Sequence, residues 1–152
     1  MLTEILKIEH LKKYFTKKRI FSSAGSSVKA VDGVSFSIKK GEVFVLAGES
    51  GSGKSTIAKL ILKSIQADSG KIIFENQEID NENINIKKIR MNCQMIHQDP
   101  YDSINPRMKI EDIVLEPLEI HNIGNKKERN RRMIEVLQEV KLEPAKEISK
   151  KY

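Results

Sequence analysis

The sequence predicts an α/β fold: strands come first, a strand–loop–helix unit lies in the middle, and helices dominate the end. An uninterrupted apolar run at 43–47, Val-Phe-Val-Leu-Ala, is typical of a strand that is buried on both faces of a parallel sheet. A glycine-rich segment follows it, and then Ile57, Leu60, Ile61 and Ile65 recur at helical spacing. With 152 residues, the chain has the length of one domain or of part of one.

Two segments before this unit are predicted to be strands. Residues 6–11 alternate apolar with polar side chains, which indicates a half-buried strand. Residues 28–38 also have strand character, interrupted by the turn-prone pair Asp32-Gly33. The stretch 16–27 is basic, contains serine and glycine, and has no sustained period, so we expect a loop there.

Beyond the middle unit, the sequence predicts two further strands and two helices. The strands are expected at 71–74 and 91–97, where apolar residues cluster over short runs. A polar loop that contains proline follows at 98–107. Apolar residues then recur at helical spacing at 110–120 and 126–140, which indicates two amphipathic helices.

The composition excludes several classes of protein. Lysine and arginine outnumber aspartate and glutamate by 27 to 21, but aromatic residues make up only 5 % and tryptophan is absent. Because single-stranded nucleic acids bind on aromatic platforms, we expect no nucleic-acid partner. The apolar runs are far shorter than the ~20 residues of a membrane span, and the N-terminus shows no secretory leader. We therefore expect a cytoplasmic protein.

The segment 48–55 carries the strongest chemical signal in the chain. Its sequence, Gly-Glu-Ser-Gly-Ser-Gly-Lys-Ser, fits the phosphate-binding pattern G-x-x-x-x-G-K-[ST] and stands between a predicted strand and a predicted helix. The alternative is a glycine-rich turn that joins these two elements and binds no ligand. The predicted ATP-binding residues of this loop are Gly48, Glu49, Ser50, Gly51, Ser52, Gly53, Lys54, Ser55 and Thr56.

Each residue type in this loop has a physical role. Glycines let the backbone curl so that successive N–H groups point at phosphate oxygens. The N-terminus of the following helix adds unpaired N–H groups and a partial positive charge. Lys54 supplies a positive charge for the β- and γ-phosphates, and the Ser55 hydroxyl can bind Mg²⁺. The motif predicts that the chain binds a nucleotide, but it does not specify the reaction, because kinases, GTPases, helicases and transporter ATPases all carry it.

The segments around the loop resemble the ATP-binding subunit of an ABC transporter. Residues 11–15, Leu-Lys-Lys-Tyr-Phe, resemble the A-loop of that family, and residues 95–100, Met-Ile-His-Gln-Asp-Pro, resemble its Q-loop. The resemblance implies that Tyr14 stacks on adenine. It also implies that Gln98 reaches Mg²⁺ and the attacking water, in a loop that faces the membrane-spanning subunit. ATP and Mg²⁺ are therefore the expected cofactors.

Two further segments resemble one branch of this family. The stretch 16–27 and the segment 102–108, Asp-Ser-Ile-Asn-Pro-Arg-Met, are similar to the importers of peptides and nickel. The resemblance implies hydrolysis of MgATP coupled to uptake, with transmembrane permease subunits and a second ATP-binding subunit as partners. It places the protein at the cytoplasmic face of the cell membrane.

The 152 residues stop where that family would continue into its signature motif and Walker B strand. We therefore expect an incomplete nucleotide-binding domain. A β-subdomain with an antiparallel β part at its N-terminal end and a P-loop NTPase core are expected at 1–108, and the start of the helical subdomain at 109–152. A complementary C-terminal half is a further expected partner, and the chain alone is expected to be inactive. The alternatives are an ABC ATPase without a transport role and a nucleotide-binding fragment without catalysis.

Overall fold

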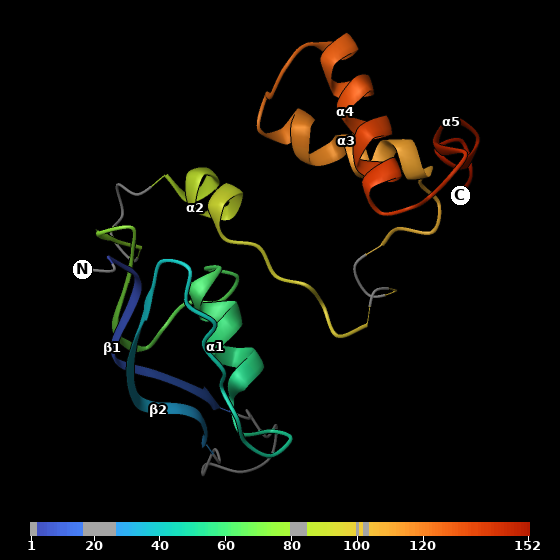
Figure 1. Cartoon of the computed structure of the whole chain (residues 1–152). Helices are drawn as coiled ribbons and strands as arrows, with labels where there is room; N and C mark the ends of the chain where they lie inside the picture. Colours follow the sequence, from blue (N-terminus) through green and yellow to red (C-terminus); the bar gives the residue numbers. More distant parts are fainter. Residues whose placement is uncertain (1–2, 17–26, 80–84, 100, 102–103) are drawn as a thin grey trace. The chain divides into compact units, whose positions relative to one another are not determined.

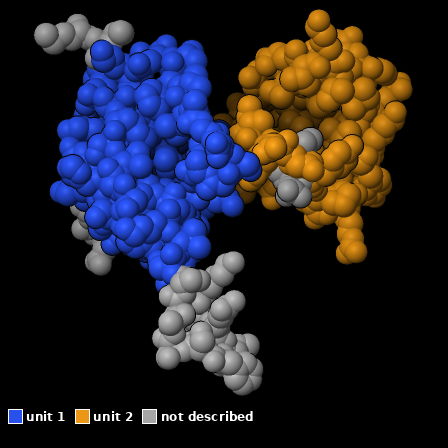
Figure 2. Space-filling model, turned by 90° about the horizontal axis from the view of Figure 1, so that it is seen from below, with its two compact units in different colours: residues 1–95 blue, residues 96–152 orange. Residues whose placement is uncertain are grey.

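The computed structural model divides the chain into two compact units, residues 1–95 and residues 96–152, which are coloured separately in Figure 2. Each unit is considered by itself. The structure describes residues 3–16, 27–79, 85–99, 101 and 104–152. Most of the loop expected at 16–27 lies outside these residues. The expected division of the domain at residue 108 stays a prediction.

The first unit contains an antiparallel sheet with the strand order β2-β1-β3-β4. Its strands are β1 (Glu4–Thr16), β2 (Ser27–Lys39), β3 (Ser69–Phe74) and β4 (Gln77–Glu78). The predicted strands at 6–11 and 71–74 are confirmed inside β1 and β3. The predicted antiparallel β part at the N-terminal end is therefore present.

The turn expected at Asp32-Gly33 is wrong, because β2 runs through this pair without a break. Leu11 pairs with Val34 and Lys12 pairs with Asp32, so Gly33 is the extra residue of a β-bulge. Its φ of 75° lies in the left-handed region that glycine adopts without strain. A turn-prone pair here bends a long strand instead of ending it.

Helix α1 (Lys54–Ile61) packs against this sheet and closes the core of the first unit (Figure 1). The predicted helix is confirmed up to Ile61, whereas Ile65, expected on the same helix, lies beyond its end. Ile57 and Leu60 are the buried residues of α1. They join Ile8 and Leu11 of β1 in one apolar cluster. Leu11 is completely buried, so the strand that carries Tyr14 is anchored in the core just before that residue.

The predicted buried strand at 43–47 is wrong for this structure. Val43 and Val45 are 90 % and 75 % exposed, and among the described residues no hydrogen bond joins the backbone of 43–47 to another segment. The ring of Phe44 stacks on Phe36 of β2 at a centroid distance of 4.8 Å. A buried strand needs hydrogen-bonding neighbours. Because the described residues supply none, the segment lies along the unit without joining its sheet.

The predicted strand at 91–97 is also wrong. Helix α2 (Ile86–Asn92) covers its start, and residues 93–97 lie in neither helix nor strand. The side chain of Asn85 caps α2 by accepting hydrogen bonds from the N–H groups of Lys87 and Lys88. Ile89 fixes the helix to the core, whereas Ile96 is 97 % exposed.

The second unit is helical, as predicted from the apolar spacing. It contains α3 (Ile110–Ile120), α4 (Lys126–Glu139) and α5 (Ala145–Ile148). Met133, Leu137 and Ala145 form its buried cluster. None of the helices in the described part of the chain has the length and apolar character needed to cross a membrane.

Candidate functional site

The glycine-rich loop leads directly into α1, which begins at Lys54. Gly53 is the residue before the helix, and its φ of 92° and ψ of 0° are left-handed. This backbone conformation strains any residue that has a Cβ. The glycine of the G-K-[ST] pattern is therefore required locally, by the turn from the loop into the helix.

The first turn of α1 keeps its backbone donors free. Gly53 offers no side-chain cap, and the first helical turn contains no acidic residue. Among the described residues, the N–H groups of 54–56 have no hydrogen-bond acceptor. A helix N-terminus of this kind presents free donors and a partial positive charge to an anion. The loop therefore fits a phosphate group.

The side chain of Lys54 folds back over the loop. Its Nζ atom lies 2.7 Å from the carbonyl oxygen of Gly48 and 2.6 Å from that of Glu49. It also donates to the hydroxyl oxygen of Ser52 at 3.1 Å. The ammonium group thus lies among the loop residues, where it adds a full positive charge to the free N–H groups of the helix.

The loop also lies directly against strand β2. A Cβ atom on Gly53 would fall well inside 3.0 Å of the carbonyl oxygen of Ala30, and 3.2 Å from its carbonyl carbon. Real Cβ atoms do not approach backbone this closely. Gly53 is therefore required twice, once by its conformation and once by its contact with β2. Sequence reasoning supplied only the first requirement.

The two hydroxyl residues after Lys54 differ in exposure. The side of α1 that carries Ser55 is exposed, whereas Thr56 is half-buried. In the described part of the chain, no group of three or more histidine, cysteine or carboxylate side chains is arranged to hold a metal ion. The role expected for Ser55 as a ligand of Mg²⁺ stays a prediction.

Tyr14 lies on β1 directly opposite Lys29 of β2. Its phenol donates a short hydrogen bond to Oδ1 of Asp32, and Lys29 Nζ lies 3.2 Å from Oδ2 of the same carboxylate. The Lys29 ammonium also lies 5.5 Å from the centre of the Tyr14 ring, within the range of a cation–π contact. Three side chains thus form one cluster, which we call the Tyr14 cluster: Tyr14, Lys29 and Asp32.

The ionisation of this cluster follows from its contacts. The hydrogen bond from Tyr14, with a further one from Lys29, holds the pKa of Asp32 below its ordinary value. The same hydrogen bond, which only the protonated phenol can donate, raises the pKa of Tyr14. Asp32 is therefore a carboxylate and Tyr14 a neutral phenol at neutral pH.

A second carboxylate holds the backbone of the same residue. Oδ2 of Asp68 accepts the Tyr14 N–H at 2.6 Å, and Oδ1 lies 2.8 Å from Lys13 Nζ. These bonds hold the pKa of Asp68 below its ordinary value, with the Lys13 contact as the largest cause. Sequence reasoning missed both carboxylates, because they meet Tyr14 only through strand pairing and a turn distant in sequence.

Gln98 belongs to the second unit, and its side chain is exposed. The loop around it is described only in part, since 100, 102 and 103 lie outside the described residues. Tyr14 and the glycine-rich loop belong to the first unit. The role expected for Gln98 therefore stays a prediction.

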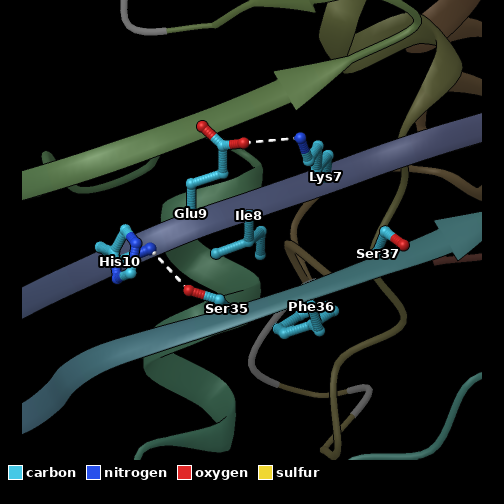
Figure 3. Close-up of a pocket in the computed structure, with 7 residues that line it drawn as sticks. All are labelled: Lys7, Ile8, Glu9, His10, Ser35, Phe36 and Ser37. Carbon is cyan, nitrogen blue, oxygen red and sulfur yellow. Dashed lines mark hydrogen bonds and ion pairs between the residues drawn. The ribbon is translucent and has the colours of Figure 1, made fainter.

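A separate hollow of about 520 Å³ lies over β1 and β2, and Figure 3 shows the side chains that line it. Two contacts join its polar groups: Lys7 pairs with Glu9 at 2.6 Å, and the backbone N–H of His10 donates to the Ser35 hydroxyl at 2.8 Å. Phe36 contributes an apolar wall. None of its lining residues belongs to the glycine-rich loop, so the hollow is not the predicted nucleotide site.

Comparison with known proteins places these features in context. The family model for the ABC transporter matches residues 31–152. Two relatives from Bacillus subtilis strain 168, the oligopeptide transport ATP-binding proteins AppF and OppF, are each 42 % identical over 93 % of this chain. The matches cover 44 % and 46 % of those relatives, so the chain spans about half of their length.

Solved structures give the same result for the fold. The ATP-binding cassette MJ0796, in a dimeric post-hydrolysis state bound to ADP and Pi, matches 97 % of this chain and 61 % of its own length with a TM-score of 0.74 and 22 % identity. The cbiO1 protein of Clostridium perfringens, described as part of the transporter complex cbiONQ, matches 90 % of this chain and 50 % of its own, with a TM-score of 0.65 and 27 % identity.

Proposed function

The chain belongs to the ABC transporter family, and from this premise we propose that it is the nucleotide-binding part of a peptide importer. In this proposal it binds MgATP in the glycine-rich loop at the start of α1. Peptides are the favoured cargo because the relatives with 42 % identity are named as oligopeptide transport proteins. Nickel, which the sequence resemblance also allows, has no such support among the relatives named above.

Each expected site residue has a defined role in this proposal. Lys54 and the free N–H groups of 54–56 bind the phosphates, and the Ser55 hydroxyl binds the Mg²⁺ that accompanies them. Tyr14 stacks on the adenine ring, and Gln98 serves the metal ion and the attacking water. Bound Mg²⁺ neutralises phosphate charge, while this chain's own residues bind and orient the nucleotide.

The observation that carries the proposal is the position of the Lys54 ammonium group. It lies within 2.7 Å of two loop carbonyl oxygens, next to a helix N-terminus whose donors are free. Loop oxygens already accept from this ammonium group, but among the described residues no group accepts from the N–H groups of 54–56, and an anion would satisfy these free donors. We therefore favour a phosphate-binding loop over a glycine-rich turn that binds no ligand.

The test is a calorimetric titration of MgATP into the 152-residue chain and into two lysine variants. Lys54→Ala removes the phosphate charge partner, so we expect affinity to fall by at least tenfold. Lys59→Ala changes an exposed lysine on the same helix and serves as the matched control, with unchanged affinity. Equal affinity for Lys54→Ala and the parent would refute the assignment.

The partners of the proposed subunit are transmembrane permease subunits and a second ATP-binding subunit, at the inner face of the membrane. A complementary half of the domain is a further proposed partner. The exposed apolar residues Val43 and Val45 support this last partner, because their segment has free backbone groups that added strands would pair. An ABC ATPase without a transport role remains the second candidate, and the names of the peptide-transport relatives speak against it.

We also propose that the 152-residue polypeptide binds ATP without turning it over. Its sequence contains no strand of four apolar residues followed by Asp-Glu, so no acid is available in the position expected to orient the water. Removing such a group costs several powers of ten in rate. A phosphate-release assay on the purified chain tests this.

Two additions make the assay decisive. Adding the residues of the Bacillus subtilis relative AppF that the match does not cover should restore hydrolysis, if they supply the missing strands and acids. Lys54→Ala then identifies contamination, because a contaminating ATPase would be unaffected by it. Steady hydrolysis by the 152-residue chain alone, abolished by Lys54→Ala, would overturn the proposal.

A further inference from the structure

We propose that Asp32 is a positioning residue, which holds the Tyr14 ring in the orientation that stacks against the base of the bound nucleotide. This inference rests on the proposed function, because it takes Tyr14 as the contact for the base. Asp32 itself acts through Tyr14 and touches no nucleotide atom. Four contacts of the Tyr14 cluster and its surroundings support this role.

The first contact fixes the phenol end of the ring. The Tyr14 hydroxyl donates to Oδ1 of Asp32, which lies on the neighbouring strand. Asp32 pairs with Lys12, which lies two residues before Tyr14 on β1. The Tyr14 side chain therefore extends along the strands to reach this carboxylate. A half-buried tyrosine ring near the end of a strand is otherwise free to change its rotamer. The hydrogen bond selects one orientation.

The second contact engages the other oxygen of the same carboxylate. Lys29 Nζ lies 3.2 Å from Asp32 Oδ2, and the same ammonium lies 5.5 Å from the centre of the Tyr14 ring. Asp32 therefore places a cation over one face of the ring as well as holding its hydroxyl. A base that approaches this face displaces Lys29, whereas the opposite face is not covered by this ammonium group.

The third contact holds the backbone of Tyr14. Its N–H donates to Asp68 at 2.6 Å, and the Asp68 N–H donates to the carbonyl oxygen of Lys12 at 2.9 Å. Phe15, the next residue, is 44 % exposed, and its only ring contact among the described residues is Lys13 Nζ at 5.6 Å. Of the two neighbouring aromatic residues, Tyr14 alone is held at both the backbone and the tip of its side chain.

The fourth contact connects the cluster to the phosphate loop. Ala30 follows Lys29 on β2, and its carbonyl group is the backbone group against which Gly53 packs. The strand that carries Lys29 and Asp32 is thus the strand against which the loop lies. A ring oriented by Asp32 and a phosphate site at Lys54 are therefore supported by one element, as a nucleotide with a base and a phosphate chain requires.

The test compares two ligands, MgATP and magnesium tripolyphosphate, which share phosphates but differ in the base. Dissociation constants are measured by calorimetry for the parent chain, for Asp32→Ala, Asp32→Asn, Tyr14→Phe and Tyr14→Ala, and for the double variant that combines Tyr14→Ala with Asp32→Ala. Asp32→Ala and Tyr14→Phe each lose the hydrogen bond, so both should weaken MgATP about fivefold, the effect of one net hydrogen bond. Asp32→Asn keeps an acceptor oxygen of the same size and should retain parental affinity.

Tripolyphosphate gives the readout that a purely structural role would not produce. If Asp32 acts through the ring, tripolyphosphate binds the parent and every variant equally, and Asp32→Ala has no further effect on MgATP when Tyr14 is already alanine. Equal weakening of both ligands by Asp32→Ala, or an added loss in the double variant, would overturn the positioning role.

The proposed function and this inference fail in distinguishable ways. If Tyr14→Ala leaves the affinity for MgATP unchanged, the base contact assigned to Tyr14 is wrong, and the inference about Asp32 falls with it. If Tyr14→Ala weakens MgATP but Asp32→Ala does not, only the inference is refuted. The phosphate site is tested separately by Lys54→Ala, since that change affects tripolyphosphate and MgATP alike.

Discussion

Replacing Gly53 with alanine tests whether the glycine-rich loop is held against β2. The φ of Gly53 is 92°, and a residue with a Cβ in the left-handed region costs about 1–2 kcal/mol. The added Cβ would also fall inside 3.0 Å of the Ala30 carbonyl oxygen, which is backbone and cannot rotate away. Overpacking of this kind costs about 1–3 kcal/mol. We expect the free energy of unfolding to fall by about 2–5 kcal/mol.

Gly51 provides the matched control in the same loop. Its φ of 82° is also left-handed, but a Cβ there would meet no atom within 4 Å. Gly51→Ala should therefore carry the conformational cost alone, about 1–2 kcal/mol. The difference between the two variants isolates the contact with Ala30.

The assay is urea unfolding without nucleotide, followed by circular dichroism. We expect the free energies of unfolding of the two variants to differ by about 2 kcal/mol. With a urea m-value of about 2 kcal/mol/M, this difference separates the two midpoints by about 1 M urea. Omitting nucleotide keeps any effect on phosphate binding out of the measurement. Equal midpoints for Gly53→Ala and Gly51→Ala would refute the close packing of the loop on β2.

Two further predictions concern Asp68 and the cap of α4. The pKa of Asp68 in the folded chain lies below its ordinary value, with the Lys13 contact as the largest cause. The ionised carboxylate therefore stabilises the fold above the pKa of Asp68 in the unfolded chain, and this contribution is lost as the pH falls through its pKa in the folded chain. Asp68→Asn should therefore lower the urea midpoint at pH 6. The difference from the parent should shrink as the pH falls below the ordinary aspartate pKa and disappear only below the lower pKa of folded Asp68. The Asn125 side chain accepts from the N–H groups of Lys127 and Glu128, so Asn125→Ala should cost about 1 kcal/mol, measured as lost helical ellipticity and a lower midpoint.

Each of these two predictions has a variant that checks it. Lys13→Met removes the largest cause of the Asp68 shift, so its urea midpoint should lose the same acid dependence. A variant Asp68→Asn that differs from the parent by the same amount at every pH would contradict the ion-pair argument. Asn130 is an exposed residue inside α4, and Asn130→Ala should not destabilise the helix. Equal losses for Asn125→Ala and Asn130→Ala would refute the role of the cap.

Several elements of the fold could be predicted because their signals are local. The alternation at 6–11 and the helical spacing at 110–120 reflect which side chains face a core, and the structure confirms both. Helix α1 followed from the apolar residues after the glycine-rich loop. Such patterns depend on neighbouring residues alone, so they predict the element independently of its tertiary contacts.

The two predicted strands that the structure lacks depended on partners instead. The run at 43–47 has the composition of a buried parallel strand, but a strand forms only where other strands pair with it. No strand in the described part of the chain pairs with residues 43–47, and Val43 and Val45 are exposed. The first residues of the segment 91–97 belong to helix α2 instead, which is stabilised by the cap at Asn85 and by the burial of Ile89.

The family and the candidate phosphate loop could be identified from the sequence alone, because both are carried by consecutive residues whose chemistry does not depend on distant contacts. Gly53, Lys54 and Ser55 could be named from their spacing alone. Only the tertiary structure decided that Gly53 packs on Ala30 and that Asp32 holds Tyr14. These contacts join strands whose register and bulges arise from packing and hydrogen bonding across the sheet, and no pattern along one segment encodes them.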